Sequence, residues 1–149
     1  MYFSGKKIKN MVKQPNVTLK IILRSKKKIL IMRHKDGNYD FPGGRMEWGE
    51  ELFSTLKRET KEELNFVLID EPRLFHVWNY KSKDGKRQSI MIYFFQELAK
   101  PIKFVSPENI DIFWLAKNEM GKIIHHRDFI KRIYGWKNKK TTSNMNYPD

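Results

Sequence analysis

The chain has 149 residues, of which 40% are hydrophobic and 13% aromatic, a composition that suits one folded domain and argues against disorder. It contains no cysteine, which excludes disulfides, thiolate catalysis and thiolate metal ligands, so any metal must be bound by oxygen or imidazole. No apolar run approaches the roughly 18 residues of a membrane span, and no secretory signal is evident, so we expect a cytoplasmic protein with no membrane partner.

The formal net charge of +13 is concentrated in particular segments. About half of it comes from residues 1–16 and 137–149, and much of the rest lies in two short runs, 26–28 and 81–87, that are typical of solvated turns. We expect this charge to attract anionic nucleotides or phosphates. The basic ends would also allow contact with RNA, but the distribution does not favour a folded RNA-binding face.

The first part of the chain predicts an arm and two strands. Residues 1–15 are basic and lack a clear period, so we expect a flexible arm there. Apolar and polar residues alternate from Val17 to Arg24, which predicts a strand, and a more buried strand is predicted over Ile29–Arg33. A turn at Asp36–Asn38 and the glycine-rich stretch Phe41–Arg45 follow.

The pattern becomes helical between Trp48 and Leu64. Apolar residues recur there at spacings of three and four, which predicts one buried stripe formed by Leu52, Phe53, Leu56, Thr60 and Leu64. Glu50 and Glu51 favour the positive N-terminal end of this helix.

The remaining segments predict a mixed sheet covered by helices. An Asp-Gly turn within Lys83–Lys86 predicts a hairpin. The expected strands are Phe66–Ile69, Leu74–Tyr80, Ser89–Leu98 and Asp111–Leu115, and the expected helical segments are Asn118–Ile123 and Arg127–Tyr134. The polar residues 137–149 predict a disordered tail, which leaves a single domain over 16–136. The fold class is therefore expected to be α+β.

Three glutamates stand out within the predicted helix. Glu59, Glu62 and Glu63 are spaced i, i+3 and i+4, which places their carboxylates on one helix face. Such closely packed negative charges repel each other unless a cation compensates, and hard divalent cations prefer oxygen ligands. A metal site is one interpretation of this pattern, and an ordinary solvated acidic face is the other.

The residues around these glutamates decide between the two interpretations. The spacing of Gly44, Glu50, Arg58, Glu59, Glu62 and Glu63 across 23 positions resembles the Nudix box, in which a glycine, a glutamate and an Arg-Glu…Glu-Glu set recur at these intervals. Thr60 replaces the usual aliphatic residue, and its methyl group can still face the core. Asn65 replaces the usual glycine, and asparagine is the next-best residue for a left-handed helix end.

The resemblance implies a fold, a cofactor and a reaction. The fold would be a mixed, curved β-sheet sandwiched between helices (α/β/α). Glu59, Glu62 and Glu63 would bind Mg²⁺ or Mn²⁺, with the Gly43 carbonyl as a further ligand, and Arg58 would pair with Glu50 to brace the carboxylates. Family members cleave a nucleoside diphosphate linked to another group, which yields a nucleoside monophosphate and a phosphorylated product. Dimers are frequent among relatives, so a homodimer is possible.

Several residues outside the box are further candidates. The resemblance implies an extra glutamate in a late loop as ligand or general base, and Glu108 is our candidate, with Glu97 and Glu119 weaker; an exposed loop acid is the alternative. Arg33 and Arg45 could contact substrate phosphates, or have plain surface roles. Trp48, Trp78 and Tyr80 could stack on a base, although strand spacing predicts that Trp78 is a core residue. We do not expect His125-His126 to bind metal, because adjacent helix residues diverge.

Two other functions remain open from the sequence. Hydrolysis at the 5′ end of RNA would combine the box with the basic ends. A non-catalytic Nudix-like module that binds nucleotide or RNA for regulation is the alternative class, but it would have no need to hold three repelling glutamates.

Overall fold

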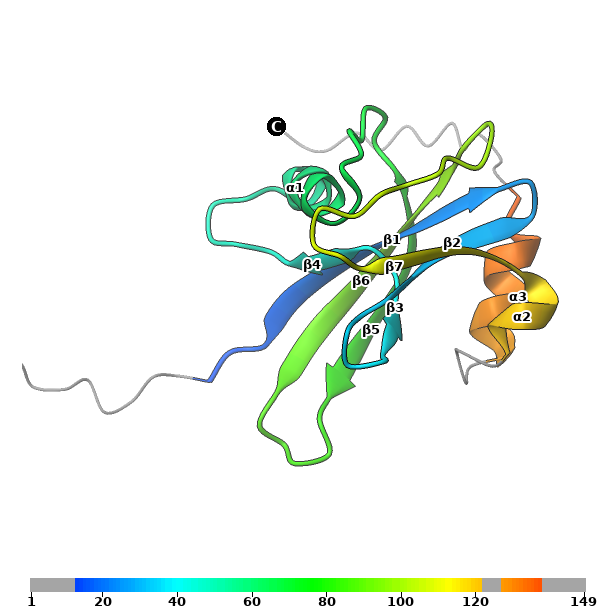
Figure 1. The fold of residues 1–149 in the computed structure, drawn as a ribbon. Helices are drawn as coiled ribbons and strands as arrows, with labels where there is room; N and C mark the ends of the chain where they lie inside the picture. Colours follow the sequence, from blue (N-terminus) through cyan, green and yellow to red (C-terminus); the bar gives the residue numbers. More distant parts are fainter. Residues whose placement is uncertain (1–12, 122–126, 138–149) are drawn as a thin grey trace, which may run out of the picture.

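The computed structural model describes residues 13–121 and 127–137, which form seven strands and three helices (Figure 1). In chain order these are β1 (Asn16–Ser25), β2 (Lys28–Arg33), β3 (Tyr39–Asp40), β4 (Gly43–Arg45), α1 (Leu52–Leu64), β5 (Arg73–Lys81), β6 (Gln88–Glu97), β7 (Asp111–Ala116), α2 (Lys117–Met120) and α3 (Arg127–Gly135). The α+β class predicted from the sequence is confirmed.

Strand β1 is the centre of a mixed sheet with the order β3-β2-β1-β6-β5. It pairs with β6 in parallel over all but its last residue, from Asn16 opposite Ser89 to Arg24 opposite Glu97. Along its other edge β1 pairs first with β4 and then with β2, both antiparallel. Strand β7 pairs with β2, and β5 forms the edge beyond β6. This branching brings the short strand β4 beside the first half of β1.

Helices cover both faces of the sheet. Leu19, Ile21 and Leu23 of β1 belong to one buried cluster with Leu56 and Leu64 of α1. A second buried cluster contains the alternate residues of β1 and β2 together with buried residues of α3. Its members include Ile22, Ile29, Ile31, Ile130 and Ile133. Because side chains alternate between the faces of a strand, α1 lies on one face and α3 on the other. The predicted sandwich of a mixed sheet between helices is confirmed.

The helix α1 begins at Leu52, four residues later than predicted. Residues 47–50 form a turn instead, in which the Glu50 amide donates to the Glu47 carbonyl at 3.1 Å and Gly49 has a positive φ of 85°. Trp48 projects into solvent from this turn, and Leu52 is 42% exposed rather than part of the buried stripe. The buried residues of α1 are Thr55, Leu56, Thr60, Glu63 and Leu64.

The strand predicted at Phe66–Ile69 does not form. The helix ends at Asn65 in the left-handed conformation, and the Phe66 amide donates back to the Thr60 carbonyl at 3.2 Å. Leu68 is buried against α1, while Val67 and Ile69 are exposed. The apolar alternation therefore reflects a segment that packs one side on the helix and joins no strand of the described sheet.

Several predictions concern residues outside the described ranges. They are most of the basic arm 1–15 and of the tail 137–149, the end of the Asn118–Ile123 segment, and His125-His126. Within the described residues, no helix has both the length and the apolar character that crossing a membrane requires.

Candidate active site

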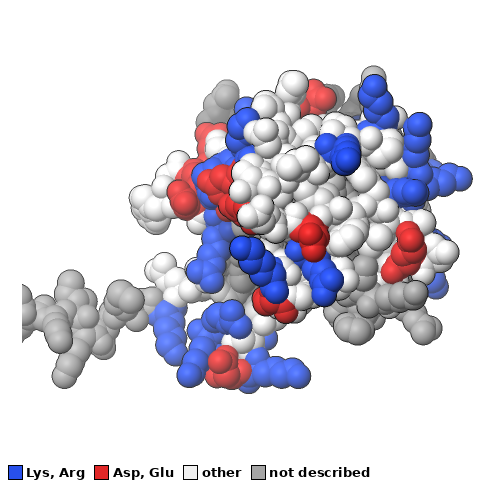
Figure 2. Space-filling view, in the orientation of Figure 1, with Lys and Arg blue, Asp and Glu red and all other residues white. Residues whose placement is uncertain are grey.

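The three glutamates of α1 lie where the helix meets strand β4. Side-chain exposure is 14% for Glu59 and 48% for Glu62, and Glu63 is buried. Figure 2 shows acidic side chains gathered at the left of the molecule, where Figure 1 draws the loop from β4 to α1. The carboxylates thus sit at the junction of a helix and a strand edge rather than on an open helix surface.

Two glycines allow the backbone of β4 to approach these carboxylates. The Gly43 amide donates to Glu63 Oε1 at 2.7 Å, and Gly43 has a φ of 137° that side chains rarely adopt. A Cβ atom at Gly44 would lie only 2.3 Å from Glu59 Oε1. Neither position accommodates a larger residue without moving β1 or the Glu59 carboxylate, which gives the glycine pair a direct structural reason.

The guanidinium of Arg58 links the acidic residues to the loop. Its Nε donates to Glu50 at 3.0 Å, Nη1 to Glu59 at 2.8 Å, and Nη2 to the Arg45 carbonyl at 2.9 Å. Glu62 lies 3.5 Å from Nη1. The expected contact between Arg58 and Glu50 is present. Burial alone would raise the pKa of Glu50, but hydrogen bonds from Thr55 and Arg58 bring that pKa below its ordinary value.

Burial makes the charges of Glu59 and Glu63 costly. Burial raises the pKa of Glu59, and Arg58 offsets only part of that effect while neighbouring Glu62 adds to it. Burial also raises the pKa of Glu63 to about 8, against the opposing effects of the Gly43 amide and Lys20. Two carboxylates held close together in a poorly solvated position would be stabilised in their ionised form by a nearby cation.

The donor set suits a hard divalent cation such as Mg²⁺, although the carboxylates do not already converge on a single point. Among the described residues, no three acidic or histidine side chains are close enough together to hold a metal ion as they stand. The reason is visible in the contacts: Nη1 of Arg58 lies between Glu59 and Glu62, and Glu63 is bonded to Gly43. The carboxylates of Glu59, Glu62 and Glu63 and the backbone of Gly43 are nevertheless oxygen donors of the kind that a hard divalent cation prefers.

The structure adds two residues that the sequence did not indicate. Lys20 of β1 is only 7% exposed, and its ammonium forms an ion pair with Asp40 of β3. Its charge lowers the pKa of both Glu59 and Glu63. The sequence pattern of β1 does not reveal this role, because β1 is buried on both faces and only its register with Gly43 places Lys20 beside the site.

Glu108 lies near the glutamates in three dimensions. It follows β6 in a turn where its amide donates to the Ser106 hydroxyl at 3.2 Å, and its side chain is exposed. Its charge contributes to the raised pKa of Glu63. The two weaker candidates are already engaged elsewhere, because Glu97 pairs with Arg24 at 2.6 Å and Glu119 accepts from the Ala116 amide at 2.7 Å.

Three of the five candidate substrate residues share one sheet face. Arg45 lies opposite Thr18, Thr18 opposite Met91, and Met91 opposite Trp78, so one row runs across four strands. Tyr80 occupies the next row, and its ring lies 6.1 Å from that of Trp78. Residues that face each other across neighbouring strands point to the same side of a sheet. This face therefore leads from the edge strand β5 to β4 and the carboxylates.

The prediction that Trp78 is a core residue is wrong. Trp78 and Tyr80 are each 39% exposed, because β5 is an edge strand and the buried contacts of α3 lie farther along the sheet, at Phe75 and Phe95. Of the other two candidates, Trp48 projects from the loop before α1, and Arg33, at the end of β2, lies over the ring of Tyr39 at 5.7 Å.

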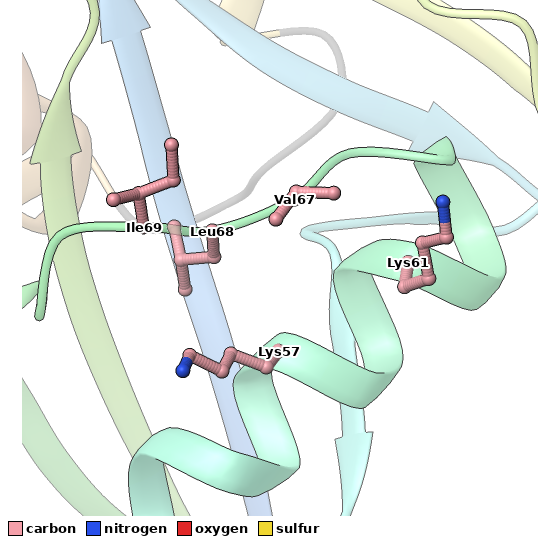
Figure 3. Close-up of a pocket in the computed structure, with 5 residues that line it drawn as sticks. All are labelled: Lys57, Lys61, Val67, Leu68 and Ile69. Carbon is pink, nitrogen blue, oxygen red and sulfur yellow. The ribbon is translucent and has the colours of Figure 1, made fainter.

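A separate groove of about 400 Å³ lies along α1 and has no acidic lining residue (Figure 3). Its walls are Lys57 and Lys61 of the helix and the segment Val67–Ile69. Lys61 donates to the Asn65 side chain at 2.8 Å, and Lys57 lies over the ring of Phe53. The groove therefore lacks the groups that would make it a second acidic site.

A family model described as NUDIX domain matches residues 13–136. A Caenorhabditis elegans protein named "Putative nudix hydrolase 6" is 35% identical over 51 residues, which are 34% of this chain and 20% of that protein. The chain thus spans about one fifth of the length of this curated relative.

Solved structures of similar fold include a MutT protein from Methanosarcina mazei, with a TM-score of 0.65 and 22% identity over 82% of this chain and 95% of that one. Another is an Ap4A hydrolase from Caenorhabditis elegans, with a TM-score of 0.64 and 18% identity over 80% of this chain and 95% of that one. These likenesses concern the fold.

Proposed function

The chain belongs to the Nudix family, and from that premise we propose that it is a metal-dependent diphosphohydrolase acting on a nucleotide-type substrate. The observation that carries the proposal is the set of Glu59, Glu62 and Glu63 on one face of α1, packed against the Gly43-Gly44 backbone. A solvated acidic face would not bury Glu63 or hold Glu59 against a glycine that leaves no room for a Cβ atom.

The chemistry divides between a bound divalent cation and the chain's own groups. Mg²⁺ or Mn²⁺ held by Glu59, Glu62, Glu63 and the Gly43 carbonyl would polarise the diphosphate oxygens and lower the pKa of the attacking water. Water adds to one phosphorus, the bond from the bridging oxygen to that phosphorus breaks, and the products are a nucleoside monophosphate and a phosphorylated group.

Arg58 and Glu108 have distinct parts in this proposal. Arg58 orients Glu59 and ties the carboxylates to Glu50 and to the Arg45 carbonyl, which is the role of a positioning residue. Glu108 is near enough to affect Glu63, and it would accept a proton from the attacking water or complete the ligand set.

The substrate body would lie on the open sheet face beside the site. Arg45 would contact phosphate, and the exposed rings of Trp78 and Tyr80 would stack on a base. One structural neighbour is named an Ap4A hydrolase, and a nucleotide-type substrate for this chain is consistent with that name. The cytoplasmic location and the homodimer stay predictions.

The test is hydrolysis by the unmodified chain and by Glu62→Gln and Glu63→Gln. We expect the unmodified chain to release nucleoside monophosphate from at least one member of a panel of nucleoside triphosphates, dinucleoside polyphosphates and nucleotide sugars. Chelation should stop the reaction, and Mg²⁺ or Mn²⁺ should restore it. Each glutamine variant should lose orders of magnitude in turnover while retaining its circular dichroism spectrum, because it removes one anionic ligand.

The matched control is Glu71→Gln, which makes the same change at an exposed acid outside α1. It should retain full turnover. A Glu62→Gln enzyme as active as this control would remove the basis for the metal site. If the unmodified chain is folded and binds nucleotide but hydrolyses no member of the panel, the result would instead indicate the non-catalytic module.

A further inference from the structure

The β5–β6 hairpin ends in a tightly bonded tip. The Ser82 hydroxyl donates to Asp84 at 2.5 Å, the Lys86 amide donates to the same carboxylate at 3.0 Å, and the Arg87 amide donates to the Ser82 hydroxyl at 3.0 Å. These bonds lower the pKa of Asp84, so the residue is ionised. The one acid of the tip is therefore used to hold the turn.

The cations of the tip project outward. Lys81, Lys83, Lys86 and Arg87 are exposed, and in the described part of the chain no carboxylate forms an ion pair with any of them. Lys13 precedes β1, which begins with Asn16 opposite Ser89 at the start of β6. Figure 2 shows positive side chains gathered at the bottom of the molecule, where Figure 1 draws the β5–β6 hairpin.

Two aromatic rings adjoin this charge. Trp78 and Tyr80 lie three and one residues before Lys81 on β5, are each 39% exposed, and meet edge to face at 6.1 Å. At roughly 3.3 Å per strand residue, the distance from Trp78 to the tip is on the order of 10–20 Å. The cations and rings thus extend beyond the reach of one phosphate group.

We propose that this surface, formed by Trp78, Tyr80 and the tip 81–87, binds a single-stranded nucleic acid. Exposed rings can stack on bases of any sequence, and flanking cations can contact successive phosphates. An anionic membrane fits less well, because residues 81–87 include no apolar side chain that could enter a bilayer.

The surface also has a direction. The row from Trp78 through Met91 and Thr18 to Arg45 connects it to the strand that faces the carboxylates. A strand that extended from this surface along the row would reach β4, beside the α1 site. That placement rests on the proposed function, whereas the binding itself does not.

The test measures binding of a short, fluorescently labelled, single-stranded RNA to the full chain by anisotropy across a range of salt concentrations. Single-strand contacts give a slope of log K against log salt of about −0.7 per phosphate. The double variant Lys83→Gln/Lys86→Gln should therefore reduce the slope by about 1.4. Trp78→Ala should weaken binding by about fivefold or more at every salt concentration, because stacking does not depend on counterions.

The matched control is Lys26→Gln/Lys27→Gln, which removes the same charge at the β1–β2 turn. It should keep the slope of the unmodified chain. An equal loss of salt slope in both double variants would overturn the proposal, because the net charge of the chain would then explain RNA binding. Binding to anionic phospholipid vesicles that is tighter than RNA binding, and lost in the same hairpin variants, would also overturn it.

Failure of this inference is distinguishable from failure of the proposed hydrolase. RNA binding is measured with a chelator present, so it does not depend on turnover. If Glu62→Gln loses hydrolysis but the hairpin variants bind RNA as the unmodified chain does, only the nucleic-acid surface is overturned. Hairpin-dependent RNA binding by a chain that hydrolyses nothing would support the surface and contradict the hydrolase.

Discussion

The acidic site on α1 and the basic tip of the β5–β6 hairpin use charge in opposite ways. At the site, Glu50, Glu59 and Glu62 share one guanidinium, that of Arg58, beside the buried carboxylate of Glu63. At the tip, the single acid Asp84 is bonded to the backbone of its own turn, and the cations extend into water. Holding the charges at the site costs free energy and makes each residue depend on its neighbours. Holding the cations at the tip costs little, and they depend on each other only weakly.

This difference predicts how each region responds to substitution. Removing one member of a buried network leaves its partners without compensation, so single changes at α1 should have large and non-additive effects. Solvated cations interact weakly with each other, so changes at the hairpin should be small and additive. The four predictions below test this contrast.

The largest effect is expected from Gly44→Ala. The added Cβ atom would lie 2.3 Å from Glu59 Oε1 and must displace that carboxylate. We expect turnover to fall by about a hundredfold, because a ligand misplaced by an ångström can cost that much. Gly121→Ala adds the same atom where nothing lies within 4 Å, and it should leave turnover unchanged. Equal turnover of the two variants would mean that Glu59 is not needed in its observed position.

A smaller loss is expected from Arg58→Lys. Lysine keeps the charge but cannot reach Glu50, Glu59 and the Arg45 carbonyl together, as the three guanidinium nitrogens do. Turnover should fall by about 10- to 100-fold, the range usual for groups that orient metal ligands. Arg132→Lys on α3 is the control for the same exchange far from the site. An Arg58→Lys enzyme with unchanged kcat would show that charge alone is enough.

The cost of burying Glu63 should appear in the pH dependence of stability. Its folded-state pKa is raised to about 8 from an ordinary value of 4.5, so its favourable contribution is present below pH 4.5 and lost as the pH rises to about 8. In chelator, we expect a loss on the order of 3 kcal/mol across that window in urea denaturation. Glu63→Gln should lack this component, and added Mn²⁺ should reverse it. A chelated chain whose stability follows that of Glu63→Gln over the same window would contradict the assignment.

The smallest effect is expected at the hairpin. Lys83→Gln alone should reduce the salt slope of RNA binding by about 0.7, half the change expected for the double variant. The sum of the Lys83→Gln and Lys86→Gln effects should match the double variant within error. A strongly non-additive pair would show that the tip is a coupled site like α1, which would remove the contrast between the two regions.

Local features of the sequence predicted most of the fold and the core of the candidate site. Except for the short strands β3 and β4, alternation or a buried apolar run predicts each strand of the sheet. The Asp-Gly turn predicts the hairpin. Asn65 adopts the left-handed conformation expected of it, with a φ of 51°. Thr60 is fully buried and satisfies its hydroxyl by donating to the Leu56 carbonyl at 2.8 Å. These features depend on neighbours within a few residues.

Features that depend on register between distant segments were missed. The sequence gives no sign of the role of Lys20, because its place beside Gly43 and Asp40 follows from pairings some 20 residues apart. Trp78 was assigned to the core because the pattern does not reveal which end of a sheet a helix covers. The segment Phe66–Ile69 has the alternation of a strand but packs on α1. The basic run 81–87, by contrast, forms the exposed turn that the sequence predicts.

The most direct test of the carboxylate site is a Mn²⁺ titration followed by electron paramagnetic resonance, with the unmodified chain, Glu63→Gln and Glu71→Gln compared at one pH above 8. The buried, repelling carboxylates predict that the unmodified chain and Glu71→Gln bind Mn²⁺ alike, and that Glu63→Gln binds at least about tenfold more weakly. Equal Mn²⁺ binding by all three chains would contradict the proposal that α1 holds the catalytic cation.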